Sequence, residues 1–301
     1  MSHNNLSILS HANKQDIQNE PYPYIVIKNA LDINIFEQLQ KEYPNIDVII
    51  NHREKKDTWY DYPTCLALHN PQVSPLWKEF LAYHTSNAFY QEIVDLFDIE
   101  LRKTYPEIKT ILGKEWGDLT TSMRLPGAAS NKQNYETDLS LETQFYVNFT
   151  QKVRTIRGPH IDRPTELYAA LLYFREENDD SIGGDLQVNS AKQPIALYPN
   201  ANSVKVDCLP MEISDDKVDV VNTIKYEPNT MVLFLNTNKS IHAVSQRSPT
   251  IIPRKHINFT ADIFNLPNEG LFNIKHKPSK KLKKWLQRQP IIWRCASLIN
   301  D

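Results

Sequence analysis

The sequence is poor in cysteine and glycine and carries almost no net charge. Its three cysteines, Cys65, Cys208 and Cys295, form no CxxC pair, which argues against a disulfide framework and is typical of a reducing compartment. Seven glycines occur without a GxGxxG or GxxxxGK pattern, so the common nucleotide-binding loops are excluded. A net charge of −2 gives no overall field that would attract nucleic acid.

The sequence also lacks long apolar runs. None reaches the roughly 18 residues that a membrane-spanning helix needs. The N-terminus is polar and has no apolar region of the kind found in secretory signals. We therefore expect a cytoplasmic protein, and 301 residues are enough for one elaborated domain or for a core with added helices.

Composition divides the chain into four parts. Residues 1–20 are polar and are predicted to form a disordered tail. Residues 21–140 mix helical and strand patterns and are expected to pack on the core. Residues 141–264 read as the core itself, and residues 265–301 form a basic C-terminal extension.

The N-terminal part begins with a strand over residues 21–27 and continues with helices. Helix N-caps are predicted at Asp32, at Ser74 before a proline, and at either Thr85 or Ser86. Residues 47–70 are charged and irregular, with Trp59 among them, and are interpreted as a loop that could line or cover a site. His84 has no partner at ligand spacing and is expected at the surface or at a cap.

The segment 142–153 alternates between apolar and polar residues, as a strand does. One face carries Phe145, Val147 and Phe149, and the other carries Gln144, Tyr146 and Asn148. Such a polar face usually meets water, but in a ligand-holding barrel or jelly roll it lines the cavity, which is the interpretation favoured here. Residues 190–222 read as an insertion.

A histidine and a carboxylate lie two residues apart at His160 and Asp162, so on a strand both point to the same side. An apolar stretch over residues 167–174 follows, as expected of a buried strand. Another apolar run, residues 231–235, leads to a second histidine, His242. Two histidines and one carboxylate are the ligands with which iron enzymes hold Fe(II) while leaving coordination positions open.

A candidate anchor for an anionic cosubstrate follows His242. Arg254 opens an alternating strand over residues 254–261, whose polar side also carries His256. A guanidinium binds a carboxylate with two parallel hydrogen bonds. Arg247 and Lys255 compete for this role, but Arg247 falls in the connecting turn and Lys255 faces the other side of the strand. Arg254 is therefore preferred.

Taken together, His160, Asp162, the turn Gly183–Leu186, the segment Ser240–Val244 and Arg254 resemble the prolyl-hydroxylase-type 2-oxoglutarate and Fe(II)-dependent oxygenases. The resemblance covers residues 140–262 well and residues 21–100 loosely. It implies an α+β fold, with a double-stranded β-helix (jelly-roll) core and N-terminal helices packed outside, to which the composition of the last residues adds a basic helical tail. Many prolyl hydroxylases have lysine at the anchor, and family members often have Ser or Thr two residues later, where this chain has His256.

The resemblance also implies a set of site residues and cofactors. The metal ligands, which are also the catalytic residues, would be His160, Asp162 and His242. The 2-oxoglutarate anchor would be Arg254, and the polar faces of the two alternating strands add Tyr146, Gln144, Asn148 and His256 to the predicted cosubstrate site. The cofactors would be Fe(II), 2-oxoglutarate and O2, with ascorbate as a supporting reductant. The implied reaction is hydroxylation of an unactivated C–H bond.

Three functional hypotheses remain open at this point. The first is the oxygenase, acting on a small molecule, a peptide or an anionic or membrane-associated glycolipid. The second is a jelly-roll enzyme that uses Zn or Mn at the same ligands for other chemistry. The third is a non-catalytic binding module on the same fold. Arg254 favours the first over the second, because hydrolysis needs no distal anion anchor.

The C-terminal segment 275–294 combines lysine and arginine with Trp and Leu residues, a pattern of basic amphipathic helices that lie on anionic membranes. A solvated face of a packed helix has the same pattern. If the segment is functional, we expect peripheral contact with the inner membrane face, at about 1 kcal/mol per basic residue at low salt. Co-sedimentation with anionic liposomes that weakens with salt would support this, whereas equal binding to neutral liposomes would leave only the structural role.

Overall fold

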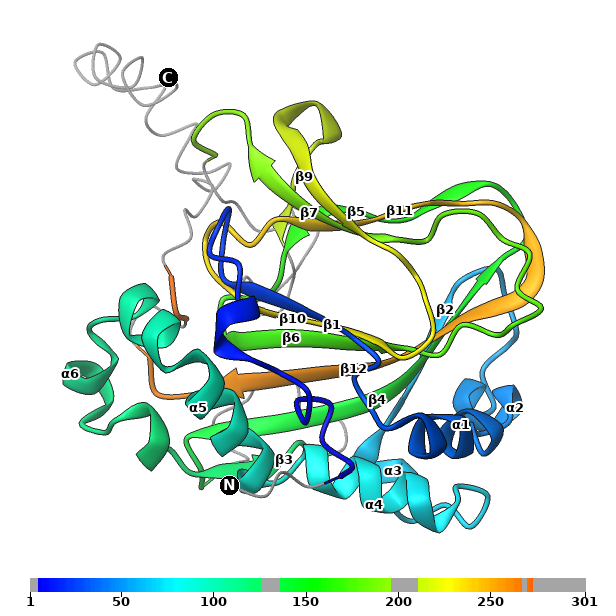
Figure 1. Cartoon of the computed structure of the whole chain (residues 1–301), viewed down its shortest axis with the longest axis horizontal. Helices are drawn as coiled ribbons and strands as arrows, with labels where there is room; N and C mark the ends of the chain where they lie inside the picture. Colours follow the sequence, from blue (N-terminus) through cyan, green and yellow to red (C-terminus); the bar gives the residue numbers. More distant parts are fainter. Residues whose placement is uncertain (1–4, 126–135, 196–210, 267–269, 273–301) are drawn as a thin grey trace, which may run out of the picture.

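The computed structural model describes residues 5–125, 136–195, 211–266 and 270–272. In this part of the chain, two antiparallel β-sheets lie face to face, and helices cover the outer face of the larger sheet (Figure 1). The arrangement is a mixed α+β fold consistent with a double-stranded β-helix, because consecutive strands over residues 139–191 and over residues 218–263 alternate between the sheets. None of the described helices is long and apolar enough to cross a membrane.

The larger sheet has the strand order β1-β10-β6-β12-β4-β2, and β3 pairs with β4 in the parallel direction. Its strands are β1 (Tyr24–Lys28), β2 (Trp59–Pro63), β3 (Thr121–Met123), β4 (Leu139–Thr150), β6 (Glu166–Tyr173), β10 (Thr230–Leu235) and β12 (Thr250–Ile263). The smaller sheet has the order β8-β5-β11-β7-β9. Its strands are β5 (Arg154–Ile161), β7 (Leu186–Ala191), β8 (Met211–Glu212), β9 (Val218–Ile224) and β11 (His242–Arg247).

Several of the helices begin directly after an N-cap residue. They are α1 (Ile33–Lys41), α2 (Ile46–Ile50), α3 (Thr64–Ala67), α4 (Pro75–His84), α5 (Asn87–Thr104) and α6 (Ile108–Leu112), with short 3₁₀ turns at Lys14–Asp16, Trp116–Asp118 and Asp215–Lys217. The side chains of Asp32, Ser74 and Ser86 accept hydrogen bonds from backbone N–H groups in the first turns of α1, α4 and α5. The predicted caps are confirmed, with Ser86 rather than Thr85 capping α5.

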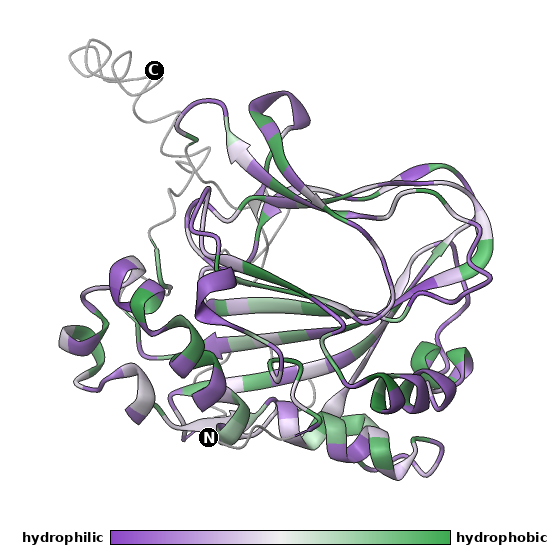
Figure 2. Cartoon of the chain, viewed as in Figure 1, coloured by the Kyte–Doolittle hydropathy of each residue, from purple (hydrophilic) through white to green (hydrophobic). Residues whose placement is uncertain are grey.

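The main hydrophobic core lies between the larger sheet and the helices. Trp77 of α4 is fully buried, and its ring lies 4.7 Å from that of Phe145 on β4. Hydrophobic and hydrophilic residues alternate in bands along the helices (Figure 2), as expected of helices that bury one side. This packing leaves the opposite face of the larger sheet directed toward the smaller sheet.

The alternation of side chains on β4 places its apolar residues in the hydrophobic core and its polar residues in a cavity, as the sequence predicts. Phe145, Val147 and Phe149 belong to the core under the helices. The polar residues of the other face line a cavity between the sheets, which confirms the predicted placement of Gln144, Tyr146 and Asn148. The same alternation on β12 places Arg254 and His256 in that cavity.

The prediction of a disordered tail over residues 1–20 is wrong for its described residues, 5–20. Leu6, Ile8 and Leu9 are buried in the main core, and a β-bridge between Gln18 and Tyr24 also holds this otherwise polar segment. The N–H of Ile8 donates to Nε2 of His84, which is buried rather than exposed. Burial lowers the pKa of His84 to about 3, so the ring is neutral and serves as an acceptor.

Two further segments are more regular than predicted. The expected loop 47–70 contains α2, α3 and the edge strand β2, which pairs with β4. The expected insertion 190–222 contributes β8 and most of β9 to the smaller sheet, with residues 196–210 outside the described part. Of the predicted basic extension 265–301, residues 267–269 and 273–301 also lie outside the described residues.

Candidate metal centre

The three predicted ligands come from two neighbouring strands of the smaller sheet. His160 is near the end of β5, and His242 begins β11. The antiparallel register places these two histidines directly opposite each other, and Asp162 follows His160 by two residues. The cross-strand pairing explains why residues more than eighty positions apart meet at one point.

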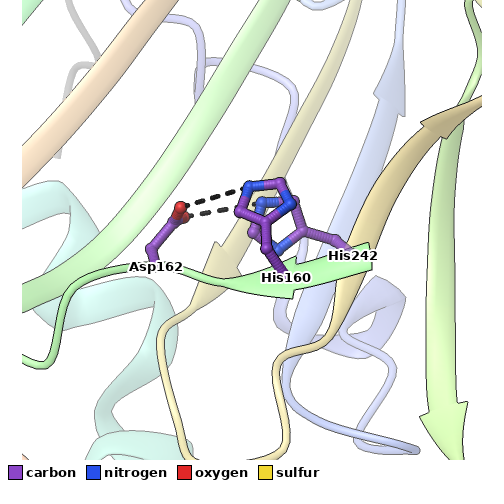
Figure 3. A group of neighbouring side chains, drawn as sticks. All are labelled: His160, Asp162 and His242. Carbon is purple, nitrogen blue, oxygen red and sulfur yellow. Dashed lines mark ion pairs between the residues drawn. The ribbon is translucent and has the colours of Figure 1, made fainter. Parts of the chain in front are cut away.

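The ligand atoms of the three side chains all lie within 4.8 Å of one another. Nε2 of His160 is 3.5 Å from Oδ1 of Asp162, and Nε2 of His242 is 3.6 Å from Oδ2 of the same carboxylate. Figure 3 shows the carboxylate facing both imidazoles. Donor atoms bound to one ion at about 2.0–2.2 Å are separated by roughly 3–4 Å, so the arrangement fits a divalent metal held on one side.

The backbone fixes which nitrogen of each ring faces the metal position. Nδ1 of His160 donates to the Gly158 carbonyl at 2.8 Å, and Nδ1 of His242 donates to the Ser240 carbonyl at 3.0 Å. With Nδ1 donating to a carbonyl, Nε2 is the ring nitrogen that can offer a lone pair to a metal. Burial, followed by the neighbouring His242 and Arg157, holds the pKa of His160 well below its usual value, so this ring is neutral without a metal.

The triad opens into a cavity of about 560 Å³ between the two sheets. The polar faces of β4 and β12 form the wall opposite the histidines, with Gln144, Tyr146, Asn148, Arg254, His256, Asn258 and Thr260. All five residues predicted for the cosubstrate site are among them. A cavity of this size accommodates a small organic acid together with part of a second molecule.

Arg254 is held rigidly at one end of this cavity. Only 1 % of its surface is exposed. Nε donates to the Gly184 carbonyl at 2.9 Å, and Nη1 donates to Nδ1 of His256 at 3.0 Å. The guanidinium carbon also lies 4.7 Å from the ring centre of Tyr226 and 5.0 Å from that of Tyr173. Nη2 has no hydrogen-bond partner among the described residues.

An unsatisfied N–H on a buried cation is costly, so Nη2 fits a carboxylate that arrives from the cavity. His256 adds to this site because its Nδ1 accepts from Arg254, which leaves the proton on Nε2. Burial and the charge of Arg254 hold the pKa of His256 well below its usual value. The neutral ring therefore offers Nε2–H as a second donor at the cavity wall.

The turn Gly183–Gly184 is required by this packing. Both residues have positive φ, +81° and +75°. A Cβ on Gly183 would lie 1.9 Å from the carbonyl oxygen of Gln246, and one on Gly184 would lie 3.1 Å from Cδ of Arg247. Only glycine allows this close approach, and it brings the Gly184 carbonyl to Arg254.

The two alternative candidates for the anion anchor, Arg247 and Lys255, form contacts outside the cavity. Arg247 is fully buried, and its Nη2 donates to Asp179 at 2.9 Å and to the Ile252 carbonyl at 3.0 Å. Lys255 pairs with Glu176 on the opposite side of β12. Neither residue lines the cavity, whereas Arg254 does.

A charged network at the other end of the cavity escaped the sequence analysis. It consists of Arg124, Arg163, Glu142, Glu166 and Asp262, of which Arg124, Arg163 and Glu166 line the cavity. Asp262 could have been found by extending the two-residue alternation of β12 past Thr260. Arg124 could not, because only the pairing of β3 with β4 brings its segment to the site.

Glu142 should make stability depend on pH. Burial raises its pKa from 4.5 to about 7, so the folded protein keeps a proton that the unfolded chain loses. Stability should then fall as pH rises from about 4.5 to 7, by up to roughly 3 kcal/mol. Urea unfolding at pH 5 and pH 7.5 should show a smaller fall for Glu142→Gln than for wild type, with Glu227→Gln, a partly exposed carboxylate paired with Lys28, as the control. An identical fall in all three proteins would contradict this assignment.

The sequence matches no protein-family model and no curated protein. Among solved structures, the chain is similar to a prolyl-4-hydroxylase from Pseudomonas putida, with 12% identity over 80% of this chain and 92% of that chain and a TM-score of 0.39. An oxidoreductase of the 2OG-Fe(II) oxygenase family from Burkholderia pseudomallei gives 11% identity over 82% and 87% of the two chains, also with a TM-score of 0.39. A structure from a study of prolyl 4-hydroxylases from Phytophthora capsici gives 17% identity over 88% of this chain and 66% of that chain, with a TM-score of 0.39.

Similarity at this level does not by itself assign an activity. The chain thus has structural matches to prolyl 4-hydroxylases and 2OG-Fe(II) oxygenases, together with an HxD…H triad.

Proposed function

We propose that the protein is an Fe(II)- and 2-oxoglutarate-dependent oxygenase that hydroxylates an unactivated C–H bond of an organic substrate. One observation carries the proposal. A single cavity holds a His-Asp-His triad on one sheet and, on the other sheet, a buried arginine whose Nη2 lacks a partner among the described residues. Metal ligands and an anion anchor in one cavity are what a chelating keto acid requires.

Each side chain has a defined task in this proposal. His160, Asp162 and His242 would hold the ion on one side, and the hydrogen bonds of both Nδ1 atoms keep the imidazoles oriented. Arg254, with His256 beside it, would bind the distal carboxylate of 2-oxoglutarate, and Gln144, Tyr146 and Asn148 would form the surrounding wall. Bound iron would supply the oxidation of substrate by O2, with succinate and CO2 as co-products, and ascorbate would keep it reduced.

The alternative hypotheses are less well supported. A Zn or Mn enzyme of other chemistry could use the same triad but has no need of Arg254. A binding module has no need of three convergent ligands with both Nε2 atoms facing the carboxylate. The substrate itself could still be a small molecule, a peptide or a glycolipid.

Removing a ligand should abolish turnover without unfolding the protein. Asp162 is partly exposed, and its described ion pairs are with the two ligand histidines, so Asp162→Ala should keep the thermal midpoint of the metal-free protein. Wild type should convert 2-oxoglutarate to succinate only when Fe(II) and O2 are both present, and the variant should not. The control is Asp219→Ala, an exposed carboxylate on β9. Metal-independent turnover, or full activity of Asp162→Ala, would refute the proposal.

Arg254→Ala should weaken 2-oxoglutarate binding and leave metal binding almost unchanged. In this variant the distal carboxylate of 2-oxoglutarate would be buried without a partner, at a cost of roughly 2–5 kcal/mol. This cost raises the dissociation constant of 2-oxoglutarate by about 1.5–3.5 decades. Arg254→Lys should recover only part of this, because an ammonium cannot form two parallel hydrogen bonds. Calorimetric titration with 2-oxoglutarate measures these affinities, and Lys255→Ala serves as the control at the neighbouring position. Equal losses in Lys255→Ala and Arg254→Ala would mean that Arg254 is not the anchor.

A further inference from the structure

Arg157 is a cation on the same strand as His160 that the proposed chemistry does not use. In a regular strand, residues three apart face opposite sides. The register of β5 and β11 shifts, however, so that His242 lies opposite His160 and Val244 lies opposite Arg157. This bulge, next to Gly158, turns Arg157 to the same side as His160, and both line the cavity.

The guanidinium of Arg157 is held only weakly by the protein. Its ion pair with Glu212 spans 3.9 Å, and the side chains are 40% and 59% exposed. An ion pair this long and this exposed contributes little to stability, so another anion can readily replace Glu212 as the partner of Arg157. Arg157 therefore lies at the open part of the cavity with its charge available to an incoming molecule.

An aromatic surface lies on the other sheet. Trp59 of β2 stacks on Tyr146 of β4, with ring centres 5.3 Å apart and an angle of 15°. Both residues line the cavity that Arg157 lines, and Trp59 is 49% exposed. The exposed face of this indole offers a flat apolar contact at the cavity opening.

The other cations of the cavity already have defined partners. Arg163 pairs with Glu166 and Asp262, and Arg124 pairs with Asp262 and Glu142. Arg254 lies at the buried end, where 2-oxoglutarate would bind. Among the cavity cations of the described chain, Arg157 is thus the one placed to meet an anion at the opening.

We infer that Arg157 and Trp59 select the substrate, and that the substrate carries an anionic group, carboxylate or phosphate, next to a flat apolar ring. The inference rests on the proposed function, because it places the substrate beside the triad. The anion would replace Glu212 on Arg157, and the ring would lie on Trp59.

Calorimetric binding of three probes to the full-length protein, loaded with Zn(II) and 2-oxoglutarate, tests this. The probes are 1-naphthoate, 1-naphthyl phosphate and the neutral 1-naphthamide. Wild type should bind at least one anion about tenfold more tightly than the amide, and whichever anion binds better identifies the group. Arg157→Gln should lose this preference, whereas Arg102→Gln, an exposed arginine on α5, should keep it. Trp59→Ala should weaken all three probes by a similar factor.

No anion preference in wild type, or a preference that survives in Arg157→Gln, would overturn the inference. So would a preference lost in Arg254→Ala but not in Arg157→Gln, because the probe would then occupy the buried end. The titration of 2-oxoglutarate itself separates the two proposals. Its affinity should be unchanged in Arg157→Gln, and if wild type does not bind it, the proposed function fails whatever the probes show.

Discussion

A fully buried guanidinium is the constraint on which the site depends. Removing a positive charge from water is expensive unless polar partners replace the lost hydration. Around Arg254 these partners are a backbone carbonyl, a neutral imidazole and two aromatic rings, and no described ion pair joins it to a carboxylate. The glycine turn, the register of β12 and the neutral tautomer of His256 all serve to hold the cation with one N–H left for an incoming anion.

Because side chains on a strand alternate between its two faces, each central strand of the larger sheet contributes one face to the hydrophobic core and the other to the cavity. On β4 and β12 the apolar face packs against helices, and the polar face forms the cavity wall opposite the metal centre. This part could be predicted from sequence, because the alternation around Phe145 and Arg254 is a local property of the chain. The spacing of His160 and Asp162 is equally local, and His242 is indicated by its position after the apolar run 231–235, an interpretation that the resemblance to known oxygenases reinforces.

What could not be predicted depends on pairing between distant segments. Nothing local shows that the polar residues before Pro21 contain three side chains that enter the core, or that His84 accepts a hydrogen bond from Ile8. The strand β2 is hidden in a charged segment, because its partner β4 is far along the chain. The inward direction of Arg157 follows from a bulge, which shifts the register without a sequence signal strong enough to locate it.

The most direct test of the central claim is a crystal structure with Mn(II) and 2-oxoglutarate, in which anomalous scattering locates the metal. One ion is expected at about 2.0–2.3 Å from Nε2 of His160, Nε2 of His242 and a carboxylate oxygen of Asp162. The distal carboxylate of the keto acid should accept a hydrogen bond from Nη2 of Arg254. An ion bound elsewhere, or a keto acid that does not reach Arg254, would contradict it.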